Sequence, residues 1–326
     1  MHTRILGKTG FNVSEIGLGT WQLGGDFGAV SEETAQEILG TARRLDVNFW
    51  DTADVYGAGL SERRIGSYGD KKDVFVATKL GRGPQFEGMT KFDRPRVKES
   101  LQGSIKRLGV EVLDLAQLHC IPAEVLRDGE IFSIMDDMQK EGLVRFWGAS
   151  IENVDEALLC LNHPGLSTLQ IIFNLLRQDY TEEVFPKAKE ANVGVIVRLP
   201  LASGLLSGKW RKDTTFPPED HRNYNRDGQA FNVGETFSGL PFAKGVELVE
   251  EGLKPSVSPE MSLSQFALRW ILDHEAVSTV IAGVTKPAQL KANVEAAEFP
   301  PLSPALHAEL SSWYKNNVKA HIRGRI

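Results

Sequence analysis

The chain has 326 residues, of which 41% are hydrophobic and 25% charged, as in an ordinary globular protein. Its net charge of −6 disfavours a general nucleic-acid-binding protein, because such proteins rely on dense basic patches. With two cysteines, a disulfide framework is not expected, and a reducing cytosol is the natural location. The start of the chain lacks the apolar core of a signal peptide, and no apolar run approaches the roughly 18 residues of a membrane span. We therefore expect a cytoplasmic protein without a nucleic-acid or membrane partner, and leave its oligomeric state open.

The first segment with a structural signal is residues 5–13. It contains the turn sequence LGKTG between two short apolar stretches. We expect a small hairpin that plugs the bottom of a barrel.

From residue 45 onward, strand-like and helix-like segments alternate. Short apolar β-rich runs occur at 15–18, 47–50, 74–78, 113–118, 144–149, 169–173, 193–197 and 278–281. Helical periodicity lies between them, most clearly at 31–45, 94–109, 130–142 and 184–192. Eight strands alternating with helices predict an α/β fold, a (β/α)8 TIM barrel formed by one domain over residues 1–326. The main structural alternative is an open, doubly wound sheet.

One long polar stretch, residues 209–239, interrupts the alternation after the seventh strand. A loop this long is usually a functional lid or disordered. Because it follows the C-terminal end of a strand, we place it at the active face of the barrel. Beyond it, residues 262–265 carry a capping-box pattern, and residues 304–317 predict a terminal helix.

Four side chains of different chemistry fall at or just after successive strand ends: Asp51, Tyr56, Lys79 and His119. Each has an ordinary interpretation alone, as a loop cap, a packing residue, a snorkelling lysine or a core histidine. They converge only if their strands are neighbours in a barrel. A lysine ammonium beside Tyr56 would then favour the phenolate and lower the pKa of the phenol. Asp51 would keep Lys79 charged, and His119 would position a substrate oxygen, so the set suits protonation of an oxygen that becomes an alcohol.

These residues lie in the runs WDTADVYG, VATKL and LAQLHC, and the chain also contains GLGTW and GASIENVDEAL. Together the motifs resemble those of the aldo-keto reductases, over nearly the whole chain. The resemblance implies a (β/α)8 barrel that reduces aldehydes or ketones with a nicotinamide cofactor. It assigns Tyr56 as the proton donor, tuned by Lys79 and Asp51, with His119 beside the carbonyl.

The resemblance also implies residues around the nicotinamide, with two departures from the family pattern. Gly19, Thr20, Trp21 and Asp51 match the lining of the nicotinamide and substrate pocket, and Ser150 and Gln170 match the residues that bind the carboxamide. The family commonly has Asn where this chain has Ile151, and Asn153 is out of register. Many members place an aromatic residue where this chain has Arg198, which could stack on the ring or reach a substrate anion.

The rest of the cofactor is expected along the later strand ends. The resemblance matches Leu199, Pro200, Leu201, Ser203 and Lys209 to residues around the pyrophosphate, and Gly283, Thr285, Lys286, Gln289 and Asn293 to residues around the adenosine. A helix N-terminus with Thr285 and Lys286 is a suitable anion site, so we expect NADP(H) rather than NAD(H).

The preferred hypothesis is an NADPH-dependent carbonyl reductase acting on a small-molecule carbonyl or alcohol. The first alternative is a nicotinamide-nucleotide-sensing regulatory or binding protein on the same fold. A barrel hydrolase or lyase using Asp51 and His119 is a second alternative, but it gives no role to Tyr56 and Lys79. No metal is expected, because no residues stand at ligand spacing. The physiological substrate and the direction of the reaction stay open.

Overall fold

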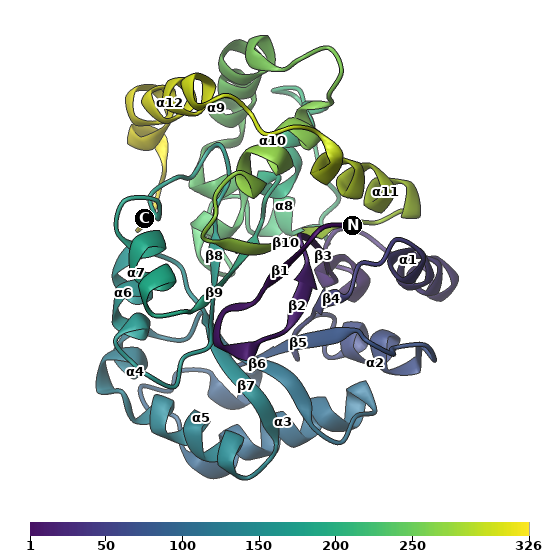
Figure 1. Cartoon of the computed structure of the whole chain (residues 1–326), viewed down its shortest axis with the longest axis vertical. Helices are drawn as coiled ribbons and strands as arrows, with labels where there is room; N and C mark the ends of the chain where they lie inside the picture. Colours follow the sequence, from purple (N-terminus) through teal and green to yellow (C-terminus); the bar gives the residue numbers. More distant parts are fainter. Residues whose placement is uncertain (326) are drawn as a thin grey trace.

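Eight parallel strands close into a barrel in the computed structural model, which describes residues 1–325 (Figure 1). Around the barrel the order is β10-β3-β4-β5-β6-β7-β8-β9. The strands are β3 (Ile16–Gly19), β4 (Phe49–Asp51), β5 (Phe75–Leu80), β6 (Leu113–His119), β7 (Val144–Ser150), β8 (Thr168–Ile172), β9 (Gly194–Arg198) and β10 (Val277–Gly283). Each overlaps a predicted segment. The (β/α)8 barrel is confirmed, and the open sheet is excluded because β10 pairs with β3.

Helices surround the barrel on the outside (Figure 1). Their bounds are α1 (Glu32–Arg44), α2 (Leu60–Ser67), α3 (Arg94–Leu108), α4 (Ala123–Asp128), α5 (Glu130–Lys140), α6 (Val154–Leu161), α7 (Val184–Glu190), α8 (His221–Tyr224), α9 (Phe242–Glu247), α10 (Leu263–Leu272), α11 (Pro287–Glu295) and α12 (Pro304–Trp313). Local chemistry sets their ends: α10 begins with the predicted capping box between Ser262 and Gln265. Among residues 1–325, no helix is long and apolar enough to cross a membrane.

The N-terminal hairpin closes one end of the barrel, as predicted. Strands β1 (Thr3–Ile5) and β2 (Asn12–Ser14) pair antiparallel and lie across the barrel opening in Figure 1. Phe11 stacks on Phe75 of β5 with ring centroids 4.2 Å apart. The turn needs glycine at position 7, where φ is +49° and an added Cβ would lie 2.2 Å from the backbone nitrogen of Gly194.

The predicted long segment at 209–239, hereafter the insertion, contains α8 and short 3₁₀ turns. Three contacts fasten the insertion to other parts of the chain. The backbone N–H of His221 donates to the carbonyl of Asp26 (3.0 Å), and the guanidinium of Arg323 donates to the carbonyl of Gly239 (3.0 Å) and pairs with Asp227 at 2.5 Å. These contacts hold the insertion against the rest of the protein.

Candidate active site

A cavity of about 1050 Å³ opens at the C-terminal ends of the strands. The insertion contributes to its wall and therefore lies at the active face, as predicted. The catalytic candidates among its lining residues are Asp51, Tyr56 and His119, and Lys79 lies buried beneath them. Register explains the convergence, because Gly19 pairs with Asp51, Lys79 with Gln117, and His119 with Ser150.

A buried ion pair forms the floor of the site. Lys79 Nζ contacts Asp51 Oδ1, and the two side chains are 0% and 2% exposed. The same ammonium donates to the carbonyl of Thr52 (2.8 Å) and to the Tyr56 hydroxyl (3.3 Å). Asp51 Oδ2 accepts from Gln117 (3.1 Å) and Gln170 (2.8 Å). Burial alone would lower the pKa of Lys79, but Asp51 and Tyr56 outweigh it and raise that pKa, so the ammonium stays charged.

Tyr56 presents its hydroxyl from the loop after β4. Its ring stacks against Trp21 with centroids 5.8 Å apart. The pKa of Tyr56 is raised above its ordinary value, because burial outweighs the lowering effect of Lys79. This corrects the sequence-based expectation of a lowered phenol pKa, which considered the charge of Lys79 but not the burial of the hydroxyl. The phenol is therefore a protonated acid at neutral pH.

His119 ends β6 edge-on to the Tyr56 ring, with centroids 5.8 Å apart. It is 4% exposed. Burial first, and then the charges of Arg82, Lys79 and Arg198, hold its pKa well below the usual value. The imidazole is therefore neutral and offers one N–H donor. Its Nδ1 is buried without a hydrogen-bond partner among residues 1–325.

Most residues expected around the cofactor do line this cavity. They are Gly19, Thr20, Trp21, Asp51, Gln170, Arg198, Leu199, Pro200, Leu201, Ser203, Lys209, Gly283, Thr285, Gln289 and Asn293. Ser150 and Lys286 do not line it. Ser150 Oγ lies behind the wall, 3.4 Å from Gln170 Oε1 and 3.7 Å from Cys120 Sγ.

The departure at position 151 has a structural counterpart. Ile151 is buried in the core. Asn153 instead caps α6, where its side chain accepts from the backbone N–H of Glu156 and donates to the carboxylate of that residue, both at 2.9 Å. Asn153 is thus occupied, and neither residue replaces the missing amide at the carboxamide position.

The loop after β9 has an unusual backbone. Leu199, Ala202, Ser203 and Gly204 all have positive φ, at 53°, 47°, 54° and 94°. Backbone N–H groups in turns that contain left-handed residues can converge on an anion. This local geometry fits a pyrophosphate, and Lys209 lies on the same cavity wall.

At the start of α11 the helix terminus is already partly capped. Gln289 Oε1 accepts from the backbone N–H of Thr285 (2.8 Å) and of Lys286 (3.0 Å). The Thr285 hydroxyl also donates to Gln289 Oε1 (3.2 Å), so an anion at this terminus would depend on the Lys286 ammonium or would displace the Gln289 side chain. The preference for NADP(H) stays a prediction.

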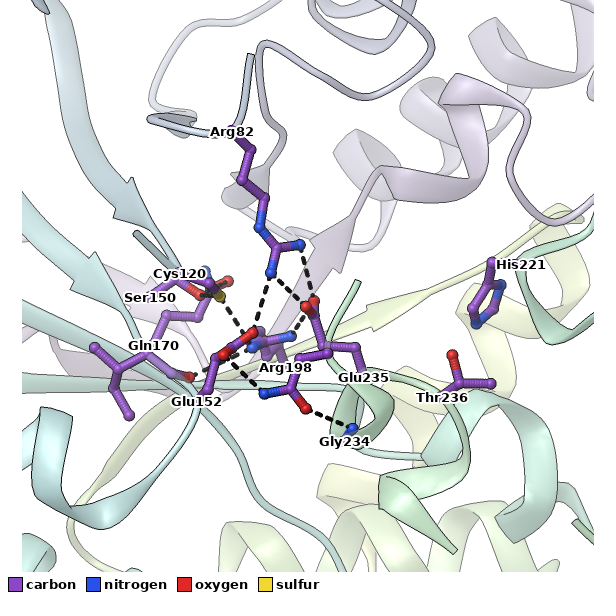
Figure 2. A network of polar contacts seen from close by, with 12 residues as sticks. Arg82, Cys120, Ser150, Glu152, Gln170, Arg198, His221, Gly234, Glu235 and Thr236 are labelled. Atoms are coloured by element: carbon purple, nitrogen blue, oxygen red, sulfur yellow. Dashed lines mark hydrogen bonds and ion pairs between the residues drawn. The ribbon is translucent and has the colours of Figure 1, made fainter. Parts of the chain in front are cut away.

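Arg198 is neither free nor stacked in this structure. Its Nη1 pairs with Glu235 Oε2 (2.9 Å), and its Nη2 lies 3.2 Å from Cys120 Sγ (Figure 2). Glu235 also pairs with Arg82, and Arg82 with Glu152 (3.2 Å). Sequence reasoning missed Arg82, Glu152 and Glu235. Position was the available signal, since Arg82 and Glu152 each follow a strand end by two residues.

Arg82 and Arg198 pair with two carboxylates, those of Glu152 and Glu235. We call these four residues the arginine–glutamate network. Burial would raise the pKa of Glu235, but Arg82 and Arg198 outweigh it and hold the pKa at about 2. Burial and the nearby Glu235 raise the pKa of Glu152 to about 7. Ligand atoms of Cys120, Glu152 and Glu235 lie within 4.8 Å of one another. Guanidinium groups already bind both carboxylates, so we describe the group as an ion-pair network rather than a metal site.

Comparison with protein families places these motifs in a known group. The model of the aldo/keto reductase family matches residues 15–315. Aldo-keto reductase YhdN of Bacillus subtilis is 30% identical over 293 residues, covering 88% of this chain and 86% of that protein. A probable voltage-gated potassium channel subunit beta of Oryza sativa subsp. japonica is 31% identical, covering 93% of each chain.

Solved structures agree. The holo form of aldo-keto reductase AKR11C1 from Bacillus halodurans superposes with a TM-score of 0.75 at 28% identity, over 99% of this chain and 98% of that one. Glycerol dehydrogenase AKR11B4 from Gluconobacter oxydans gives 0.74 at 27% identity, over 99% and 97%. With the closed barrel and the converging Asp51, Tyr56, Lys79 and His119, these matches show that the chain belongs to the aldo/keto reductase family of oxidoreductases.

Proposed function

We propose that this protein is an NADPH-dependent carbonyl reductase, which converts an aldehyde or ketone to an alcohol. One observation carries the proposal: a protonated phenol, Tyr56, stands at the cavity 3.3 Å from a buried ammonium and beside a neutral imidazole. This arrangement provides an acid at one point and a counter-charge for the anion that the acid leaves behind.

Reduction of a carbonyl needs a hydride at carbon and a proton at oxygen, and the nicotinamide supplies the hydride when it is bound. Tyr56 donates the proton to the carbonyl oxygen. Lys79 then stabilises the phenolate through its short approach to the phenolic oxygen. Asp51 holds the ammonium in place. His119 donates its N–H to the same carbonyl oxygen and so fixes the orientation of the substrate.

The cofactor would be held along the cavity by residues from several strand ends. Gln170, which accepts from Ser150 behind the wall, would bind the carboxamide, and the left-handed loop around Ser203 would hold the pyrophosphate. Thr285 and Lys286 would meet the 2′-phosphate. Membership of the aldo/keto reductase family supports these assignments, and the choice of NADPH over NADH rests on Thr285 and Lys286.

The test is NADPH consumption with a panel of aldehydes, ketones and aldoses, run beside NADH. We expect turnover with NADPH, and a loss of about 100-fold or more in Tyr56→Phe with NADPH binding retained. Tyr68→Phe is the matched control, because Tyr68 packs on Trp50 outside the cavity. A Tyr56→Phe variant as fast as the wild type would refute the role of Tyr56 as the acid.

A regulatory role is the second candidate, favoured by the relationship to a probable potassium channel subunit beta. On this alternative the protein binds the nucleotide and reports its state to a partner. Tight NADPH binding without turnover of any carbonyl would support it over the reductase, and would direct attention to Ile151 and Arg198.

A further inference from the structure

The insertion reaches the catalytic cavity through one buried carboxylate. Glu235 is 3% exposed and lies between two guanidinium groups, those of Arg82 after β5 and Arg198 at the end of β9 (Figure 2). The turn that carries it is built locally, since Asn232 Oδ1 accepts from the backbone N–H of Gly234 (2.7 Å). The backbone carbonyl of Glu235 accepts from Ser203 Oγ (3.4 Å). The carboxylate is thus fixed at both its backbone and its side chain.

Both arginines line the cavity, but Arg82 is the more exposed of the two. It is among the residues lining the cavity with Tyr56 and His119, and 22% of its side chain is exposed, against 10% for Arg198. Its guanidinium lies over the Phe231 ring, 5.9 Å from the centroid. After burial, the charge of Arg82 is the largest influence on the pKa of His119.

The hydrogen bonds of Arg82 leave one side of the guanidinium for a ligand. Nη1 and Nη2 donate to Glu235, and Nη2 also to Glu152. Nε donates to no group among residues 1–325, and it is not fully buried. Because Arg82 lines the same cavity as Tyr56 and His119, this partly exposed N–H can donate to an oxygen atom carried by the substrate.

Charge decides which kind of oxygen fits. A substrate carboxylate would approach Arg82 together with the carboxylates of Glu235 and Glu152, and would have to compete with Glu235 for the guanidinium. A hydroxyl avoids this conflict, because it can accept from Arg82 while donating to a neighbouring carboxylate. The network is therefore complementary to a neutral hydroxyl rather than to an anion.

We propose that Arg82, held in place by Glu235, is a specificity-determining residue that selects carbonyl substrates with a hydroxyl on the carbon next to the carbonyl. Arg82 binds that hydroxyl while Tyr56 and His119 hold the carbonyl oxygen. Glu235 is a positioning residue, which acts through Arg82. This inference rests on the proposed reductase function and adds a substrate class to it.

The experiment compares two ketones of the same size, hydroxyacetone and 2-butanone, with pyruvate as the anionic probe. Steady-state kcat and KM are measured with NADPH for the wild type, Arg82→Met, Glu235→Gln and Asp227→Asn. Asp227 is the control, since it fastens the insertion to Arg323 at the surface. We expect the wild type to favour hydroxyacetone over 2-butanone by at least about tenfold in kcat/KM, the scale of one hydrogen bond to a charged group.

Arg82→Met is expected to bring that ratio close to one, Glu235→Gln to reduce it, and Asp227→Asn to leave it as in the wild type. Thermal unfolding of each variant detects a general loss of structure. Such a loss lowers the activity on both ketones together and leaves their ratio unchanged. An equal loss on both ketones in Arg82→Met would overturn the proposal, as would a wild type that prefers pyruvate.

Failure of the two ideas can be told apart. If the wild type reduces 2-butanone and hydroxyacetone equally well and Tyr56→Phe is inactive, the selection by Arg82 is wrong and the reductase function stands. If the wild type binds NADPH but reduces none of the carbonyls in the wider panel, the reductase function is wrong, and the role of Arg82 is rejected with it.

Discussion

Lys79 contacts Tyr56 in two ways. Its Nζ is 3.3 Å from the phenolic oxygen and 5.0 Å from the centroid of the ring. The ammonium therefore lies where it favours the negative charge that the phenol acquires after proton transfer. In the resting protein burial dominates and keeps the pKa of Tyr56 raised. The same hydroxyl is thus protonated before the reaction and stabilised as an anion after it.

Removing this ammonium is expected to damage both activity and stability. Lys79→Met leaves Asp51 buried without its counter-charge, and breaking a buried ion pair in this way costs about 3–5 kcal/mol. We expect kcat to fall strongly and the urea midpoint to fall with it. The double variant Asp51→Asn/Lys79→Met should recover part of the lost stability but not the activity. A Lys79→Met protein as stable as the wild type would show that the pair contributes little to folding.

Cofactor preference can be tested at the start of α11. Lys286→Ala should weaken NADPH about tenfold, the scale of one hydrogen bond between charged groups, and leave NADH within about twofold. Lys291→Ala, an exposed lysine on the same helix, is the control. Binding is measured by fluorescence of the nicotinamide. Equally weakened binding of both nucleotides would contradict the role of Lys286 at the 2′-phosphate site.

The hairpin turn offers a matched pair of glycines. Gly10 has φ +66° with no atom within 4 Å of an added Cβ, whereas Gly7 combines φ +49° with a backbone clash. Gly10→Ala should cost about 1–2 kcal/mol for the left-handed conformation alone. Gly7→Ala should cost more, because the hairpin must also move away from Gly194. Denaturant unfolding of both variants measures the difference, and equal losses would contradict the predicted clash.

Asp54, two residues before Tyr56, predicts a pH dependence of stability. Burial first, and then the nearby Glu62, raise its pKa to about 7 from 3.8, although Arg107 acts in the opposite direction. A folded pKa above the unfolded one means that the contribution is full below about pH 4 and is lost as the pH rises through about 7.

Asp54→Asn carries no titrating group at this position, so the comparison isolates Asp54 from other groups. From pH 5 to pH 8, the wild type should lose more Tm than Asp54→Asn. Parallel curves for the two proteins would mean that Asp54 is ionised throughout this range.

Strand positions and the four catalytic candidates were predictable from the sequence because both depend on local pattern. A polar residue that ends an apolar β-run comes to the same rim in every strand of a parallel barrel. The positions of Lys79 and His119 at strand ends were therefore enough to predict that they share this rim. The direction of the Tyr56 pKa was not predictable, since it depends on burial that residues distant in the sequence create.

Glu235 could not have been found in the same way. It lies 37 residues beyond Arg198, in a polar segment without strand or helix periodicity. The position of Arg82 after a strand places it at the active face, but such an arginine is ordinarily solvated, so its position does not predict the partner Glu235. Only the path of the insertion along the cavity at the C-terminal strand ends brings the two arginines and the glutamate together.

The shared counter-charge of Arg82 and Arg198 also constrains how this protein can diverge. Replacing residues 209–239 alone, by drift or by grafting a relative's segment, would remove Glu235 and leave Arg82 and Arg198 without their shared counter-charge in a largely buried site. A viable exchange would have to change positions 82, 198 and 235 together. The insertion, the loop after β5 and the end of β9 are therefore expected to change together in evolution, although they are distant in the sequence.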